Sequence, residues 1–428
     1  MVARLRRPGF ARNVAVLAGG AAGAQIINAA ISPVLTRLFA PSEIGQLGLY
    51  LAFVYVASMV LSLRFEQAIV VPAGDAAAAG LAVLAGLLVP VTSVIATVVL
   101  FALIELGLGG YDSLPLVAVP IALVGLVAFG YFGVIRYWLI RQSNYRVLSE
   151  VSITQSIGRA VGQVVAGLAG LGIVGLLIGD LIGRAVGLGR MYRAAEAGFR
   201  RSRAEASVRI GRLARLYWRF PIIGVPSSLL NAAAFSLPVP LLASGYGLAT
   251  AGYFALVQRV LGLPMSIIGM SVSDTLLAHI SDLANSRPAA ALPLFRRTAF
   301  VLALIGTPIA LAVIVLGPAV FDLVFGPEWR TAGVMAAIMA PWYLAAFVVS
   351  PLSRVSVVYQ GQGWKLVYDT LSLVAVVASL VGGAAAGLTT EQAIALLSGL
   401  QVIAYVVYFL ILYHLVRQGR PGVGPVVV

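Results

Sequence analysis

The sequence predicts an all-α, polytopic membrane protein of about twelve transmembrane helices, arranged as two six-helix bundles. The chain of 428 residues is 61% hydrophobic and 10% charged, whereas average soluble domains carry about 25% charged residues. Long apolar stretches recur along its whole length, and arginines return on every second connection between them. The formal charge of +14 is therefore interpreted as loops held against an anionic membrane surface, and no nucleic-acid partner is expected.

Each predicted helix rests on a stretch of about 20 apolar residues, the length that crosses the hydrocarbon core. A β-barrel is excluded because its spans would be only about 10 alternating residues long. The stretches rich in Ala, Leu, Val and Gly lie at roughly 13–35, 46–71, 80–104, 114–136, 151–169, 171–189, 218–243, 250–273, 298–317, 331–352, 366–387 and 392–413.

The arginine distribution predicts that both termini are cytoplasmic, in an inner (plasma) membrane. Arg4, Arg6, Arg7 and Arg12 precede the first span. The later inside segments carry Arg64; Arg136, Arg141 and Arg146; the stretch 184–219; Arg287, Arg296 and Arg297; Arg354 and Lys365; and Arg417 and Arg420. A cleaved signal peptide over residues 1–30 is the alternative for the first span, but polar residues are unusual in such a segment, and here they are Gln25 and Asn28.

A weak internal repeat divides the chain. Asn28-Ala-Ala, Pro33 and Gly45 in the first half correspond to Asn231-Ala-Ala, Pro238 and Gly252 in the second. Six spans in each half give parallel repeats, because an even number of crossings returns the chain to the same side. We therefore expect an N-terminal lobe over 1–189, a basic cytoplasmic linker over 190–217 and a C-terminal lobe over 218–428.

The linker is dense in arginine, and from Val208 its apolar residues recur at helical spacing, which predicts a helix on the inner surface of the membrane. An ordinary solvated loop that only sets the topology is the alternative. In the fifth and sixth spans, Gly158-x-x-x-Gly162, Gly175-x-x-x-Gly179 and Gly179-x-x-x-Gly183 have the spacing of close helix packing.

Ionisable residues within spans are costly, so they are the candidate functional residues. They are Arg37 after the first span, Arg64 and Glu66 in the second, Arg159 in the fifth, Asp180 and Arg184 in the sixth, and Arg259 in the eighth. Arginine binds phosphate in a bidentate way and keeps its charge. A set of such groups suits an anionic, pyrophosphate-bearing substrate, whereas internal ion pairs are the structural alternative. Asp180 and Arg184, four residues apart, share a helix face and form either a structural pair or an ion-coupling site.

No enzyme chemistry is expected from these residues. The sequence has no phosphate-binding Walker loop, no cysteine, no cluster with metal-ligand spacing and no cofactor motif. Its two histidines, His279 and His414, lie far apart in the sequence, so neither a metal site nor a hydrolase triad is predicted.

Four segments resemble a known family. They are Pro33–Gly45 (PVLTRLFAPSEIG), Ser62–Pro72 (SLRFEQAIVVP), Ala255–Pro264 (ALVQRVLGLP) and Phe325–Gly333 (FGPEWRTAG). These are similar to Wzx-like O-antigen flippases, polysaccharide transporters of the multidrug/oligosaccharidyl-lipid/polysaccharide (MOP) exporter superfamily. The resemblance runs nearly end to end. It implies a MATE-like V-shaped fold around a cationic cavity lined or braced by Arg37, Arg64, Glu66 and Arg259; Arg159 is added from the charge argument alone.

The resemblance implies a flippase that moves an undecaprenyl-diphosphate-linked oligosaccharide from the inner to the outer leaflet by alternating access. It also implies membrane lipid, a polysaccharide polymerase and chain-length machinery as partners in surface polysaccharide biosynthesis. One alternative is an ion-coupled multidrug exporter of the same superfamily, which would favour acidic cavity residues. A membrane-bound glycosyltransferase or polymerase is the other, and it would need catalytic carboxylates or large loops.

Overall fold

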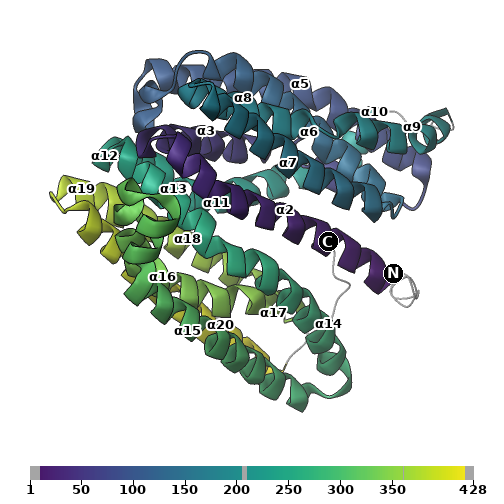
Figure 1. Cartoon of the computed structure of the whole chain (residues 1–428). Coiled ribbons are helices and arrows are strands. Elements are labelled where there is room, and N and C mark those ends of the chain that lie inside the picture. Colours follow the sequence, from purple (N-terminus) through teal and green to yellow (C-terminus); the bar gives the residue numbers. More distant parts are fainter. Residues whose placement is uncertain (1–9, 205–209, 360, 420–428) are drawn as a thin grey trace. The chain divides into compact units, whose positions relative to one another are not determined.

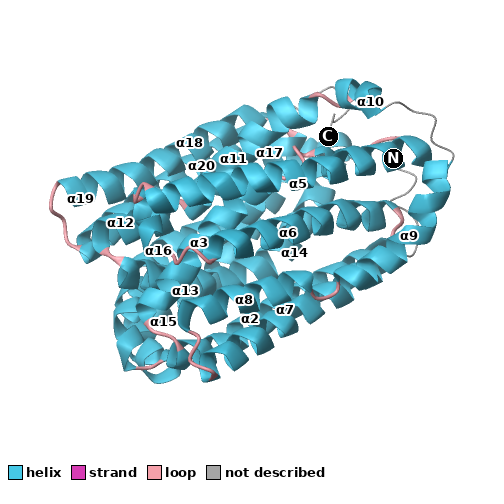
Figure 2. Ribbon diagram, turned by 90° about the horizontal axis from the view of Figure 1, so that it is seen from above, coloured by secondary structure: helices cyan, strands magenta, loops and turns pink. Residues whose placement is uncertain are grey.

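The computed structural model describes residues 10–204, 210–359 and 361–419. Arg4, Arg6, Arg7, Arg209 and Arg420 lie outside these ranges. The described residues form helices joined by short loops and contain no strand (Figure 2). By their contacts they divide into two compact units, residues 1–252 and 253–428.

The first unit contains the helices of the first six predicted spans and of the seventh. In chain order these are α2 (Phe10–Leu38), α3 (Pro41–Ser58), α4 (Phe65–Ala68), α5 (Asp75–Glu105), η1 (Leu108–Ser113), α6 (Ala118–Arg141), α7 (Tyr145–Leu168), α8 (Gly172–Ala185), α9 (Leu188–Ala204), α10 (Ile210–Leu216), η2 (Phe220–Gly224), α11 (Val225–Ser236) and α12 (Pro238–Tyr246). Helix α2 packs along α7, and α7 along α8 (Figure 1).

Helix α13 (Leu248–Pro264) begins in the first unit and continues into the second. The second unit then contains η3 (Met265–Gly269), α14 (Met270–Ser286), η4 (Pro288–Ala290), α15 (Ala291–Phe325), η5 (Pro327–Trp329), α16 (Arg330–Leu352), α17 (Val355–Val358), α18 (Gln362–Val377), η6 (Ala378–Gly382), α19 (Gly383–Ala385) and α20 (Thr390–Gln418). Helices α15 and α16 form its main pair, and α20 packs on α16.

Each of the twelve predicted stretches contains helix, although turns at residues 59–64 divide the second. Among the described residues, nine helices are long and apolar enough to cross a membrane, or ten if the bent pair of segments 220–236 and 238–246 is one span. Helices α3 and α7 do not meet this test, although they cover the predicted second and fifth spans. Their polar residues explain this: α3 opens with Pro41-Ser-Glu, and α7 carries Glu150 and Arg159.

The second predicted span, 46–71, is not one continuous helix. Helix α3 ends at Ser58, turns occupy residues 59–64, and only the short helix α4 follows. Leu63 and Arg64 have φ values of 49° and 64°, in the left-handed region that non-glycine residues rarely adopt. Arg64, Glu66 and Gln67 also interrupt the apolar composition here, so the backbone breaks where the sequence becomes polar.

The basic linker contains more helix than predicted. Helix α9 precedes the expected one and buries Met191 and Ala195, while Phe199 packs edge to face on Trp138 of α6. Helix α10 lies within the segment predicted to be helical and buries Leu213 against α5. Both helices thus pack one apolar side on the bundle and leave arginines exposed.

The repeat receives support from one contact within the first unit. Gly45 on α3 and Gly252 on α13 are equivalent in the repeat, and a Cβ on Gly45 would lie 3.1 Å from the backbone nitrogen of Gly252. The same Cβ would collide with the carbonyl oxygen of Leu248, and a Cβ on Gly252 would collide with that of Pro41. Pro41 and Leu248 are also separated by the repeat offset, so the contact is reciprocal, as expected of two-fold-related elements. The lobe boundaries at 189 and 218 stay a prediction.

Candidate functional site: two groups of buried arginines

Arg64 lies at the break in the second predicted span. It immediately precedes α4, and its left-handed backbone turns the chain between α3 and α4. Its side chain is 16% exposed and packs near η2, since a Cβ on Gly224 would lie 3.7 Å from the Cβ of Arg64. A charged residue is therefore fixed, largely buried, where the helix is interrupted.

The guanidinium of Arg64 has few strong partners. Its Nη2 donates to the thioether sulfur of Met59 at 2.8 Å, and its Nη1 lies 3.7 Å from Glu66 Oε1. The Nε finds no hydrogen-bond partner among the described residues. Guanidinium has five N–H donors, and a thioether is a weak acceptor. The arrangement leaves donors for an additional anion.

The carboxylate of Glu66 contacts both Arg64 and Ser62, which lie at the helix break. Its side chain is 11% exposed, and its second oxygen accepts a hydrogen bond from the hydroxyl of Ser62. The carboxylate is thus held partly away from Arg64, which keeps the ion pair long. Ser62 and Met59 were not among the predicted site residues, because neither is ionisable.

The second group is centred on Asp180 in α8. Its carboxylate is 1% exposed, and one oxygen lies 2.6 Å from Arg184 Nε. The other oxygen lies 3.0 Å from Arg159 Nε of α7, an ion-pair distance at which that Nε makes no aligned hydrogen bond. The predicted pair Asp180–Arg184 is present, and Arg159 joins it. Because a buried charge requires pairing, the two guanidiniums neutralise the carboxylate of Asp180. The three side chains together keep one net positive charge.

The group forms because α7 and α8 approach closely. A Cβ on Gly179 would lie 2.6 Å from the backbone nitrogen of Gln163, and one on Gly183 would lie 2.6 Å from the Cβ of Arg159. These glycines are two of those with the predicted packing spacing. Their lack of side chains brings the two backbones together and places Arg159 beside Asp180.

Three further groups hold Arg184. Its guanidinium lies 5.3 Å from the centre of the Phe129 ring, a cation–π distance. Gln155 donates to its backbone carbonyl at 3.2 Å. A Cβ on Gly125 of α6 would lie 3.8 Å from the Cδ of Arg184, so α6, α7 and α8 all contribute to the group.

The other predicted residues lie elsewhere. Arg37 is exposed at the end of α2. Arg259 is half-buried in the part of α13 that belongs to the second unit. The structure thus joins Arg64 with Glu66, and Arg159 with Asp180 and Arg184, whereas the grouping of Arg37 and Arg259 with these residues stays a prediction.

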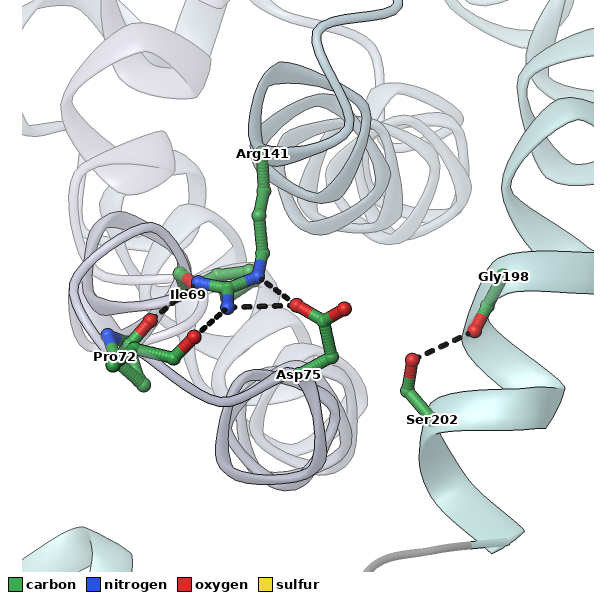
Figure 3. Close-up of polar contacts among 7 residues, drawn as sticks. Ile69, Pro72, Asp75, Arg141, Gly198 and Ser202 are labelled. Atoms are coloured by element: carbon green, nitrogen blue, oxygen red, sulfur yellow. Dashed lines mark hydrogen bonds and ion pairs between the residues drawn. The ribbon is translucent and has the colours of Figure 1, made fainter. Parts of the chain in front are cut away.

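Arg141, at the end of α6, was interpreted only as a topology signal, but it holds the loop that follows the helix break (Figure 3). It contacts Asp75 at 2.7 Å and donates to the carbonyl oxygens of Ile69, Pro72 and Ala73. Asp75 begins α5, so one arginine ties α6, the loop and α5 together. The sequence does contain a basic residue at the end of one span and an acidic residue at the start of another. Because they are far apart in the sequence, nothing in it predicted that Arg141 and Asp75 form an ion pair.

The chemistry of the two groups is ionic. In the parts of the chain that the structure describes, no three or more His, Asp or Glu side chains are placed to hold a metal ion. The arginines can bind and orient an anion by charge-assisted hydrogen bonds.

Comparisons with known proteins agree with the helical membrane architecture. The family model described as polysaccharide biosynthesis protein matches residues 34–334. A search of curated proteins finds no match.

Solved structures of the MOP superfamily share the fold. A MATE family multidrug resistance transporter in an inward-facing conformation is 14% identical, with 94% of each chain covered and a TM-score of 0.59. The lipid II flippase MurJ, in an inward closed conformation, is 14% identical over 91% of this chain and 86% of its own, with a TM-score of 0.66. A MOP superfamily transporter from Pyrococcus furiosus is 13% identical over 96% of each chain, with a TM-score of 0.55.

These identities establish the fold alone, a helical fold that the chain shares with multi-pass membrane transporters. The family match covers well over half of the sequence. The chain therefore belongs to the polysaccharide biosynthesis protein family and has the helical transporter fold of the MOP superfamily.

Proposed function

We propose that this protein is a flippase that moves an undecaprenyl-diphosphate-linked oligosaccharide from the cytoplasmic to the outer leaflet by alternating access. The observation that carries the proposal is Arg64: a largely buried guanidinium with a free Nε–H, a weak sulfur partner and a 3.7 Å ion pair. A diphosphate supplies the acceptor oxygens that this group lacks, and it matches the planar fork of arginine.

Arg37 and Arg259 are proposed as additional phosphate-binding arginines, with Glu66 bracing Arg64. Arg159 receives a different role from the one expected from the sequence. Because it lies 3.0 Å from Asp180, which Arg184 also contacts, we propose that these three residues stabilise the bundle. The family and the MurJ likeness support a lipid-linked sugar as substrate.

An ion-coupled multidrug exporter is the second candidate, because MATE transporters share the fold. A cationic drug would need an accessible carboxylate. In the described part of the first unit, Asp180 is neutralised by two arginines and Glu66 is held by Ser62 and Arg64. These pairings favour the anionic substrate.

The direct test is transport in proteoliposomes. The purified protein should transfer a fluorescent polyprenyl-diphosphate-linked oligosaccharide between leaflets, measured as the fraction accessible to a membrane-impermeant quencher. Arg64→Ala should lower this transfer. Arg212→Ala, which changes an exposed arginine of α10, is the matched control for it and should transport normally. Efflux of a cationic dye without transfer of the lipid-linked sugar would overturn the proposal in favour of the exporter.

We propose a plasma-membrane location with both termini cytoplasmic, and this topology has its own test. The chain has no cysteine, so single cysteines can be placed at Gly211 in the linker and at Ser244, both exposed. An impermeant thiol reagent on whole cells should label position 244 and spare position 211. Ser202 would be a poor site, because it is buried and donates to the carbonyl oxygen of Gly198 (Figure 3). Labelling at 211 in intact cells would reverse the assignment.

A further inference from the structure

The second unit contains a cavity of about 280 Å³ between α13, α15 and α16. None of its lining residues belongs to either arginine group, since those groups lie in the first unit. Four residues from each helix line it, among them Pro264 of α13, Gly306 and Ala310 of α15, and Ala340 and Phe347 of α16.

Small residues and a helix irregularity border the cavity. A Cβ on Gly306 would lie 2.7 Å from Leu344 Cδ1 and 3.0 Å from Phe347 Cδ1, so α15 and α16 pack closely there and an added methyl group would displace these lining side chains. Pro264 ends α13, and the wider π-helical segment η3 follows at once. Proline removes a backbone donor, so the regular hydrogen bonding of α13 is interrupted beside the cavity.

The apolar side chains that line the cavity favour a hydrocarbon ligand. Of the twelve described residues that line the cavity, Tyr343 alone has a polar side-chain group. A sugar or a diphosphate would lose its hydrogen bonds to water and find almost no replacement, which costs several kcal/mol per buried polar group. Apolar chains instead gain by leaving water or by packing closely. The volume lies just below the roughly 300–1,000 Å³ of pockets for drug-sized ligands, which suits a segment of a chain.

A positive charge lies close to the cavity along α13. Arg259 precedes Val260 and lies one helical turn before Leu263, and both of these residues line the cavity. Residues four apart share a helix face. The same helix therefore offers a cation and, next to it, an apolar space, which is the pattern of a site for an amphiphile with an anionic head.

We propose that this cavity binds a segment of the isoprenoid chain of the lipid-linked substrate, with the diphosphate toward Arg259. The proposal rests on the flippase function proposed above and adds a location for the tail to it. Methyl-branched isoprenoid units fill an irregular, branched lining of Val, Leu, Ile and Phe side chains by van der Waals contact.

The test uses the full-length protein in proteoliposomes with a polyprenyl diphosphate that carries a photoreactive diazirine in the middle of its chain. After illumination, labelled peptides are identified by mass spectrometry. Ala310→Phe fills the cavity from α15, and Ala312→Phe places the same bulk at an exposed position two residues away. Val313→Thr keeps the volume and adds a hydroxyl to the lining, which serves if Ala310→Phe folds poorly.

We expect labels on the lining segments of α13, α15 and α16 in the wild type and in Ala312→Phe. Ala310→Phe or Val313→Thr should lower this labelling about tenfold, equivalent to about 1.4 kcal/mol of binding free energy. Unchanged labelling in both variants, or equal labelling by a diazirine phospholipid, would overturn the proposal. Transport of the lipid-linked sugar is measured on the same samples: transport without labels in the cavity rejects only the tail site, whereas no transport by the wild type rejects the flippase function itself.

Discussion

Arg64 and Arg184 lie in the same unit, and each is paired with a carboxylate, but their surroundings differ. Arg184 and Arg159 contact an Asp180 that is 1% exposed, at 2.6 and 3.0 Å, across two regular and closely packed helices. Arg64 is 3.7 Å from Glu66, on a broken helix with two left-handed residues. Backbone strain of this kind persists where the surroundings impose it and is common at functional sites. We therefore propose that the tight pairing serves stability, whereas the loose pairing on irregular backbone leaves Arg64 able to bind a ligand.

The largest effect should follow from removing the shared acid of the tight group. Asp180→Asn leaves two arginines without their counter-charge, and breaking a buried ion pair costs about 3–5 kcal/mol. We expect a much lower folded yield and melting temperature, measured by fluorescence-detected size exclusion after heating. Glu66→Gln, at the loose pair, should lower the melting temperature far less.

The opposite result would change the role of Asp180. If Asp180→Asn keeps the yield but transport in vesicles no longer responds to an imposed pH gradient, Asp180 carries a coupling proton. A variant with normal yield and an unchanged pH response would remove Asp180 from both roles.

Arginine substitutions should separate the two groups by function. Arg64→Ala should lower transport about 10–100-fold with little change in melting temperature, because charged hydrogen bonds contribute about 1.5–3 kcal/mol. Arg64→Lys should restore only part of the rate, since lysine lacks the bidentate fork. Arg159→Ala should instead lower the melting temperature.

These expectations are checked by measuring transport and melting temperature on the same preparations. Normal transport by Arg64→Ala would show that this arginine does not bind the substrate. Equal losses of stability in Arg64→Ala and Arg159→Ala would remove the distinction between the loose and tight groups.

The tight group also depends on the glycines between its helices. Gly179→Ala places a methyl group 2.6 Å from the backbone nitrogen of Gln163, and such overpacking costs about 1–3 kcal/mol. Gly133→Ala in α6 is the matched control, because no atom lies within 4 Å of its added Cβ. We expect thermal denaturation to show a loss for the first and none for the second; equal melting temperatures would mean that α7 and α8 can separate freely.

The smallest effect should come from the ring beside Arg184. Phe129→Leu keeps an apolar side chain but removes the π face 5.3 Å from the guanidinium. We expect a loss of about 0.5–1 kcal/mol, seen as a slightly lower melting temperature with unchanged transport. A larger loss than that of Gly179→Ala would mean that the aromatic contact, and not the close helix packing, holds the group.

The sequence by itself determined the membrane character, the helices and the charges within them. Each follows from patterns along one segment: apolar length, arginine alternation, and the four-residue spacing that pairs Asp180 with Arg184. The glycine spacings in α7 and α8 likewise predicted close packing, because small residues on one helix face are a local feature.

Only the tertiary structure placed Arg159 on Asp180, clamped the loop before Asp75 with Arg141, and brought Gly45 against Leu248 and Gly252. These contacts join residues on different helices, so they depend on how the helices rotate and approach, which no pattern along one helix specifies. Arg64 and Glu66 interrupt the second apolar stretch in the sequence, but the left-handed turn of the backbone there was hidden for a related reason. Apolar composition reports burial in the membrane and carries no information on the sign of φ, which the packing of α4 against α5 and α6 and the partners of Glu66 impose.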